Sequence, residues 1–227
     1  MTDDREHGLA EKMAELARRV AAPSSVDDVL KSVTSTALEI IPGVDVAGVL
    51  LISKGGKFET HAGTSDLAGE LDRLQQVFQE GPCVEAAIDE LIVRTEDFEG
   101  EQRWPRYAQS VVKLGIRSGL SFKLYTSEST AGALNLFGFE PHVFDSQSEA
   151  VGSVLAAHAA AAILASRRGE QLESALTSRD LIGQAKGIIM ERYKVDAVRA
   201  FEMLRELSQT SNTKLVDIAQ SVVDSST

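Results

Sequence analysis

The chain has 227 residues, of which 43% are hydrophobic and 25% are charged, and these proportions exclude a disordered chain. Its net charge of −11 excludes a general polyanion binder, because nonspecific affinity for phosphates comes from basic charge. The charge is uneven: residues 1–166 hold 14 Lys/Arg and 25 Asp/Glu, whereas residues 167–227 hold nine of each.

The first part of the chain predicts a mixed domain of helices and strands. Helical spacing covers residues 6–22, and Ser24 or Ser25 can cap a second helix that ends near Ile41. A helix is also expected over residues 65–79. The expected strands are residues 44–52, 58–62, 92–93, 118–125 and 131–139, with a hairpin turn at 54–57.

The second part of the chain predicts only helices. All five prolines precede residue 142, and ten of the twelve aromatic residues precede residue 145. Proline breaks helix interiors and aromatic residues favour strands. We therefore predict an α+β protein with three parts: a first domain over residues 1–165, a linking helix over residues 146–177, and three helices over residues 178–227.

No targeting or disulfide chemistry is indicated. The chain begins with acidic residues rather than a signal peptide, and its most apolar stretch, residues 154–165, is too short to span a bilayer. A single cysteine, Cys83, excludes an intrachain disulfide and a cysteine-rich zinc site. We expect a cytoplasmic protein that does not bind membranes.

Three segments of the first domain occur in a familiar order: Glu-Gly-Pro-Cys-Val-Glu-Ala at 80–86, Trp-Pro-Arg-Tyr with Leu-Gly-Ile-Arg-Ser within 104–118, and Gly-Ala-Leu-Asn-Leu-Phe followed by Phe-Asp within 132–145. Together they resemble the GAF domains of actinobacterial GAF–ANTAR regulators over roughly residues 10–165. The resemblance implies a small-molecule-binding or dimerising sensor module with an antiparallel sheet flanked by helices.

The first domain offers four residues for a ligand pocket. A small-molecule ligand would be lined by His61, Cys83, Trp104 and Tyr107. The alternative, which we favour, is that Cys83 is a buried apolar residue and that Trp104 and Tyr107 pack a loop onto the sheet. The four histidines are scattered, so we expect no metal, haem or other cofactor.

The linking helix has a weak heptad pattern. Leu155, Ala162, Gly169 and Leu176 recur every seven residues, but the positions between them are mixed. This helix is interpreted both as the last helix on the sheet and as a dimerising helix, so a homodimer is expected.

The C-terminal helices are expected at residues 179–192, 196–208 and 213–223. On the first, Arg179, Gly183, Lys186 and Gly187 share one face with Met190. Two interior glycines destabilise a helix by about 1 kcal/mol each relative to alanine. They indicate close approach of either a nucleic-acid backbone or another helix, and the pattern alone does not choose between these.

The sequence Ser-Arg-Asp-Leu-Ile-Gly-Gln-Ala-Lys-Gly-Ile-Ile-Met-Glu at 178–191 is similar to the first helix of an ANTAR domain, and residues 200–219 are similar to the rest. ANTAR domains are dimeric RNA-binding modules that hold paired stem-loops in nascent leader transcripts and so prevent termination. The resemblance implies that Phe201, Leu204, Leu215, Ile218 and Ala219 form the core. It implies an RNA surface made of Arg179, Gln184, Ala185, Lys186, Gly187, Arg205, Ser208, Gln209, Asn212 and Lys214.

We therefore predict a transcription antiterminator that binds tandem RNA stem-loops and is regulated through a GAF sensor, and not an enzyme. One alternative is a sensor or scaffold whose C-terminal helices bind a protein. Another is a DNA-binding regulator, but the expected third helix carries no Lys or Arg for base recognition from Leu215 to Val223.

Overall fold

The computed structural model of the chain describes residues 14, 18, 25–52, 57–84, 91–124 and 131–225. It divides into two compact units, Met1–Ser166 and Arg167–Thr227, which we call the sheet unit and the helical unit. The helix expected over residues 6–22 and the turn residues 54–56 lie outside the described residues, apart from residues 14 and 18.

The sheet unit contains a five-stranded antiparallel sheet in the order β2-β1-β5-β4-β3. The strands are β1 (Val46–Ile52), β2 (Phe58–His61), β3 (Ile92–Thr95), β4 (Ser118–Leu124) and β5 (Ala131–Gly138). Each lies where the sequence predicts a strand, and β1 pairs with β2 as the predicted hairpin requires. The α+β class and the antiparallel sheet are confirmed.

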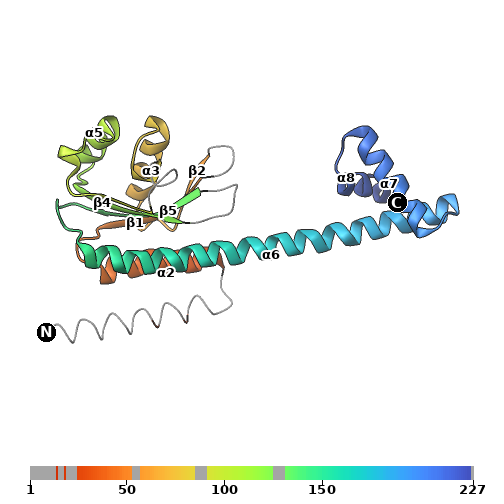
Figure 1. Cartoon of the computed structure of the whole chain (residues 1–227), viewed down its shortest axis with the longest axis horizontal. Coiled ribbons are helices and arrows are strands. Elements are labelled where there is room, and N and C mark those ends of the chain that lie inside the picture. Colours follow the sequence, from red (N-terminus) through yellow and green to blue (C-terminus); the bar gives the residue numbers. More distant parts are fainter. Residues whose placement is uncertain are drawn as a thin grey trace. The chain divides into compact units, whose positions relative to one another are not determined.

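Helices cover both faces of this sheet (Figure 1). On one face lie α2 (Val26–Ile40) and the first part of α6 (Ser146–Tyr193), whose apolar side chains join those of the sheet in one core cluster. On the other face, a second cluster joins α3 (Asp66–Phe78), η1 (Phe98–Gly100) and α5 (Pro105–Lys113) to the sheet.

Local sequence signals explain where several helices begin. The hydroxyl of Ser25 accepts a hydrogen bond from the backbone N–H of Asp28 at 3.2 Å and caps α2 as predicted. Pro105 begins α5, where its missing N–H removes no helical hydrogen bond. The carboxylate of Asp196 accepts from the N–H groups of Val198 and Arg199 and caps α7 (Ala197–Ser211).

Helix α6 is a single element of 48 residues. The separate helix expected from residue 179 is therefore its C-terminal part, because no proline or other helix-ending signal interrupts residues 167–180. In the helical unit, α7 and α8 (Leu215–Asp224) follow it, and both lie close to their predicted positions.

The apolar part of α6 is longer than the sequence analysis predicted. Residues Ser146–Ser166 are long and apolar enough to cross a membrane by length and composition. However, Val151, Leu155, Ala159 and Ile163 are buried in the core cluster of the sheet. Since these residues recur once per turn, the apolar composition is explained by packing in the sheet unit.

Packing of α6 on the sheet makes Gly152 sensitive to substitution. A Cβ atom at this position would overlap the ring of Phe122, whereas one at Gly169 would meet nothing within 4 Å. We expect Gly152→Ala to lower the free energy of unfolding by about 1–3 kcal/mol, and Gly169→Ala to leave it unchanged or raise it by up to about 1 kcal/mol. Urea unfolding followed by circular dichroism measures both; equal stability of the two variants would contradict this packing.

Candidate functional site

The three helices of the helical unit meet in a small aliphatic core. Each contributes two buried side chains, which are Ala185 and Ile189 from α6, Ala200 and Leu204 from α7, and Ile218 and Ala219 from α8. The predicted core positions Leu204, Ile218 and Ala219 are confirmed, and Leu215 packs against the cluster while partly exposed. Further apolar side chains of these helices pack against this core while partly exposed, and the exposed polar ones are available for contacts with other molecules.

Two residues differ from the sequence expectations. Ala185 is fully buried between the helices, so its side chain belongs to the core and we remove it from the candidate RNA surface. Phe201 was expected in the core but is 40% exposed. The physical reason is the same for both: alanine fills the narrow space between closely packed helices, which cannot accommodate a phenylalanine ring.

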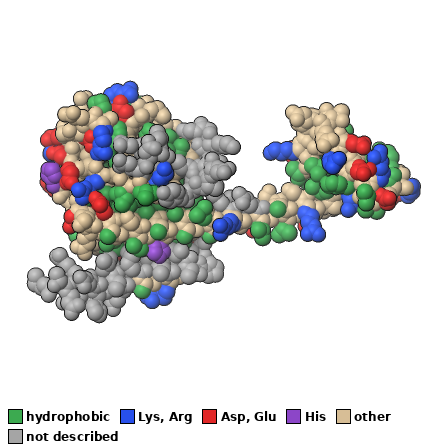
Figure 2. Space-filling model, in the orientation of Figure 1, with side chains coloured by type: hydrophobic (Ala, Val, Ile, Leu, Met, Phe, Trp, Pro, Cys, Tyr) green, Lys and Arg blue, Asp and Glu red, His purple; other side chains and the backbone are tan. Residues whose placement is uncertain are grey.

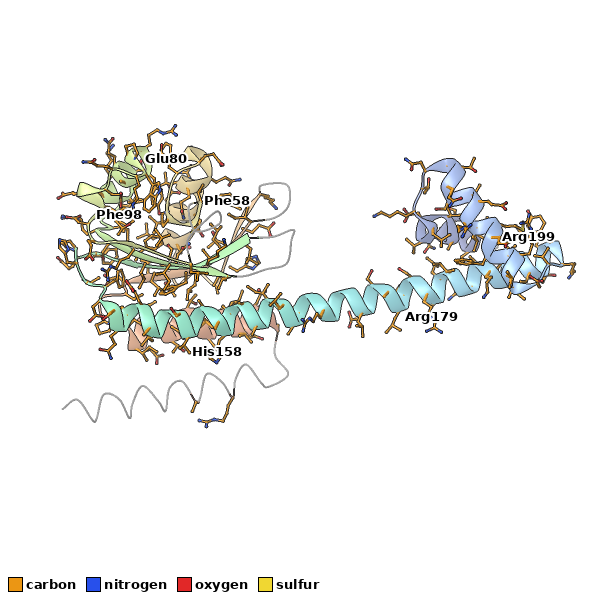
Figure 3. All side chains as sticks on the ribbon, in the orientation of Figure 1. Phe58, Glu80, Phe98, His158, Arg179 and Arg199 are labelled. Atoms are coloured by element: carbon orange, nitrogen blue, oxygen red, sulfur yellow. The ribbon has the colours of Figure 1, made fainter. Side chains whose placement is uncertain are left out.

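The cations of the candidate surface are not paired with acidic residues. In the part of the chain that the structure describes, Arg179, Lys186, Arg205 and Lys214 form no ion pair, and all are at least partly exposed. Figure 3 shows Arg179 on the side of α6 away from α7 and α8. These four charges are therefore free to meet phosphate groups.

Other cations of the same unit are paired. Lys194 lies 3.3 Å from the carboxylate of Glu191. The Arg199 guanidinium lies 3.1 Å from Glu202 and 3.2 Å from Glu206, and these acidic neighbours raise its pKa. In Figure 2, charges of both signs and hydrophobic side chains share the visible surface of this unit. Pairing is not uniform in this unit, because Arg192, which lies outside the candidate positions, is also exposed and forms no ion pair among the described residues.

The two glycines of the candidate surface have no packing role within the chain. Gly183 and Gly187 are exposed on α6, and a Cβ atom at either position would meet nothing within 4 Å. Close packing between helices of this chain therefore does not explain them. Without a Cβ atom at these two positions, a nucleic acid or a second copy could approach the helix backbone closely.

Polar residues shape the turn between α7 and α8. The hydroxyl of Ser208 donates to the backbone carbonyl of Thr213 at 2.6 Å, so Ser208 holds this turn closed. Asn212 has a φ of 51°, in the left-handed region that asparagine tolerates better than most residues. The exposed side chains of Gln209 and Asn212 make no hydrogen bond to other described residues, so their amides remain available.

The four candidate pocket residues do not lie together. His61 pairs in register with Val49 and lies 3.6 Å from the carboxylate of Asp27, on the α2 face of the sheet. Cys83 packs with Leu50 and Ala133, whose side chains point toward the opposite face. Because successive residues of a strand point to opposite faces, the sheet separates His61 from Cys83.

Trp104 and Tyr107 are buried with α3 and α5 in the second core cluster. The Arg103 guanidinium lies over the Trp104 ring, 4.3 Å from its centroid. The Tyr107 ring packs edge-on against Phe98 at a centroid distance of 5.9 Å. Both aromatic rings therefore have the packing role that the sequence analysis favoured.

A buried carboxylate, which the sequence analysis missed, lies on the Cys83 side of the sheet. Asp72 of α3 accepts hydrogen bonds from the Thr60 hydroxyl at 2.7 Å and from the Asn135 amide at 3.2 Å. The Gln75 amide is a longer third donor at 3.4 Å. Two features of the sequence could have indicated this cluster. Asp72 and Gln75 occupy inward positions of α3, and Asn135 lies inside the apolar strand β5.

The cluster extends from Asn135 to Cys83. The Cys83 thiol and the Ser121 hydroxyl both donate to Asn135 Oδ1 at 2.8 Å. Nearby, the Tyr107 hydroxyl is buried and has no hydrogen-bond partner. Since no cation compensates Asp72, burial raises its pKa to about 7, and burial also raises the pKa of the Cys83 thiol. A buried, protonated thiol is a poor nucleophile, which argues against redox chemistry at Cys83.

Among the described residues, no group of three or more His, Cys, Asp or Glu side chains could hold a metal ion. The buried cluster combines hydrogen-bonding groups and one proton that titrates near neutrality. It contains no arrangement of nucleophile and base.

Comparison with known families divides the chain as the structure does. The GAF domain family matches residues 23–164, and the ANTAR domain family matches residues 170–223. The second match begins eight residues before the expected start at 178. No curated protein matches the chain.

Solved structures resemble the sheet unit. The GAF domain of a phosphoenolpyruvate-protein phosphotransferase from Coxiella burnetii has 20% identity and a TM-score of 0.56, covering 72% of this chain and 96% of its own. An N-acylhomoserine lactone dependent LuxR family transcription factor from Burkholderia cenocepacia has 16% identity and a TM-score of 0.57, covering 72% and 99%. At these identities, the likeness shows the fold alone.

The buried carboxylate predicts a pH-dependent stability. The pKa of Asp72 rises from 3.8 to about 7 on folding, so the folded state holds this proton more tightly. The resulting stabilisation of the folded state is complete below pH 3.8 and is lost as the pH rises through 7. Between pH 5 and pH 8, the free energy of unfolding should fall by about 3 kcal/mol. Asp72→Asn removes this dependence and raises stability at pH 8.

Urea unfolding at both pH values, followed by Trp104 fluorescence, tests this linkage. Asp66→Asn, at an exposed position in the first turn of the same helix, is the matched control and should keep the wild-type pH dependence. An Asp72→Asn variant that retains the wild-type dependence would show that another group is responsible.

Proposed function

The chain belongs to the GAF domain family and carries an ANTAR domain after it, and we infer from this combination that it regulates transcription by RNA-binding antitermination under a sensory domain. We propose that it holds paired stem-loops of a nascent leader transcript and prevents the terminator hairpin from forming. This requires a cytoplasmic protein. Both matched domains are regulatory, and we propose no enzymatic activity.

The observation that carries the proposal is the set of unpaired cations in the helical unit. Arg179, Lys186, Arg205 and Lys214 coincide with positions that the ANTAR resemblance assigns to RNA. Outside this set, Lys194 and Arg199 are paired with glutamates, whereas Arg192 is exposed and forms no ion pair among the described residues. The unit has no net charge, so RNA affinity must come from a few placed cations. Such a surface favours a shaped RNA over any polyanion.

The proposed surface also contains amides that can read bases. Gln209 and Asn212 follow Arg205 on α7, and Ser208 fixes the turn that presents Asn212 and Lys214. Sequence-specific RNA recognition uses such side chains on unpaired loop bases. These contacts suit hairpin loops better than the closed duplex of a stem.

We propose that the protein acts as a homodimer through α6. Leu172 and Leu176 are 67% and 56% exposed on a part of the helix with no apolar cluster of its own. An isolated helix rarely persists in water without burying an apolar face. Pairing of two copies would cover both leucines and present two RNA surfaces to two stem-loops.

A small molecule bound in the GAF domain is the proposed input. His61 is separated from the other pocket candidates, so any ligand on the Cys83 side would meet the Asp72 cluster instead. Regulation through thiol oxidation is not supported, because Cys83 is buried.

A protein partner is the second candidate function. A groove of about 580 Å³ lies between the helices of the ANTAR domain, and its apolar lining includes Ile188, Met203, Leu207 and Val222. Recognition of DNA has less support, because α8 carries no Lys or Arg along its whole length.

Gel-shift titration of the full-length protein at physiological salt tests the proposed function. The probes are a tandem stem-loop RNA, a single stem-loop and duplex DNA of equal length. The proposal expects preference for the tandem RNA. Equal binding to all three, or binding to none by both the full chain and residues 146–227, would contradict it.

Substitution of the unpaired cations should weaken RNA binding. We expect Lys186→Gln and Arg205→Gln each to raise Kd by roughly 10-fold or more, as befits a hydrogen bond between charged groups worth about 1.5–3 kcal/mol. Lys194→Gln and Arg199→Gln remove equal charge at paired positions and should change Kd little. If all four variants weaken binding equally, total charge and not placement determines affinity.

The turn residue Asn212 allows its backbone role to be separated from RNA contact. Glycine tolerates the φ of 51° there, whereas alanine is strained by about 1–2 kcal/mol. Asn212→Gly should therefore keep the melting temperature and weaken RNA binding, while Asn212→Ala should lower both. If Asn212→Gly binds RNA with wild-type affinity, the Asn212 side chain does not contact RNA and the residue serves only as the C-cap of α7.

A further inference from the structure

The ANTAR domain leaves both of its aromatic side chains at the surface. Tyr193 is 59% exposed and Phe201 is 40% exposed, and residues 167–227 contain no other aromatic residue. In the GAF domain, Phe98, Phe122 and Phe137 are buried, whereas Phe139 is 46% exposed. Phe201 therefore offers an accessible part of its apolar surface to another molecule.

Phe201 lies on the same stripe of α7 as Arg205 of the proposed RNA surface. It precedes Arg205 by four residues and Ser208 by seven, and these spacings place the three residues on one face of the helix, which ends at Ser211 before the cap residue Asn212. Tyr193 lies elsewhere, because it lines the groove between the helices. Phe201 instead lies one helical turn before Arg205, an unpaired cation of the proposed RNA surface.

The core covers Phe201 only in part. Its chain neighbour Ala200 is fully buried and Leu204 is nearly so, and both belong to the apolar cluster of the three helices, whereas Phe201 is 40% exposed. The ring stands beside a guanidinium that forms no ion pair in the described part of the chain. A flat apolar surface next to a free cation suits a nucleotide, whose base stacks while its phosphate is neutralised.

We propose that Phe201 is a stacking platform for an unpaired base of the RNA hairpin loop, with Arg205 contacting the backbone of the same loop. This inference rests on the proposed RNA-binding function and adds a loop-reading residue to it. Stacking accepts any base, so Phe201 requires an unpaired base but does not choose its identity. Discrimination between bases is left to Gln209 and Asn212.

Stacking and charge neutralisation respond differently to salt, which separates the two residues experimentally. Neutralising a phosphate releases counterions, so loss of a cation flattens the dependence of Kd on salt, whereas loss of a stacked ring leaves that slope unchanged. We expect Phe201→Ala to raise the Kd of the full-length protein for the tandem stem-loop RNA by roughly 5- to 100-fold at every salt concentration. Arg205→Gln should reduce the slope.

Further variants separate stacking from packing. Phe201→Trp should retain wild-type affinity, whereas Phe201→Leu, which keeps an apolar side chain, should bind as weakly as Phe201→Ala. Leu207→Ala removes an exposed apolar side chain that lines the groove and serves as the matched control, with unchanged affinity. Thermal unfolding of each variant checks that the helices remain folded.

The RNA can be changed in the same experiment. Replacing the loop nucleotides by abasic ones should make the wild-type and Phe201→Ala proteins bind equally. The inference is overturned if Phe201→Ala binds like wild type, if Phe201→Leu restores binding, or if the loop change leaves the difference intact. A wild-type protein that binds no RNA would instead overturn the proposed function. The loss of affinity caused by Lys186→Gln is the reference with which the loss caused by Phe201→Ala is compared.

Discussion

The close packing of three alanines determines what the C-terminal helices can present to other molecules. Ala185, Ala200 and Ala219 are fully buried, one on each helix, and their small side chains let the helices approach closely. The six buried side chains of this core are all aliphatic, and Phe201 is 40% exposed. The exposed faces of α6 and α7 are consequently free to carry cations, glycines and amides together. In this account, RNA is recognised by individual side chains on these exposed faces, because the small core leaves most of the surface of the helices uncovered.

The GAF domain depends on a different constraint, which is a carboxylate buried without a cation. Asp72 connects α3 to β2 and β5, because it accepts hydrogen bonds from Thr60 on β2 and from Asn135 on β5. The oxygen of the same Asn135 amide accepts a hydrogen bond from the Cys83 thiol. Ionisation of this group near neutral pH opposes folding. A ligand that donates hydrogen bonds or positive charge to Asp72 would change this balance, which is suitable for a sensor.

The sequence predicted the sheet and most helices because each has a strong local signal, such as the Ser25 cap or the apolar run of β1. It predicted the GAF antiparallel sheet and the helical ANTAR region correctly. It could not place Ala185 or Phe201, since helical spacing gives the face of a residue but not the width of the space beside it. We expected two helices where the structure has α6, because residues 146–177 were assigned to linking and dimerisation and residues 179–192 to RNA binding. We grouped His61 with Cys83 because strand pairing, which puts them on opposite faces, is long-range.

In vitro selection, which does not require the natural transcript, tests the central claim that a few unpaired cations and neighbouring polar groups recognise hairpin RNA. The pool would contain tandem RNA hairpins with randomised loops, and the bait would be the full-length protein at physiological salt. The account predicts that the wild-type protein enriches a common loop sequence and that the double variant Lys186→Gln/Arg205→Gln enriches none. No enrichment by the wild type, or enrichment of the same loops by the variant, would contradict it.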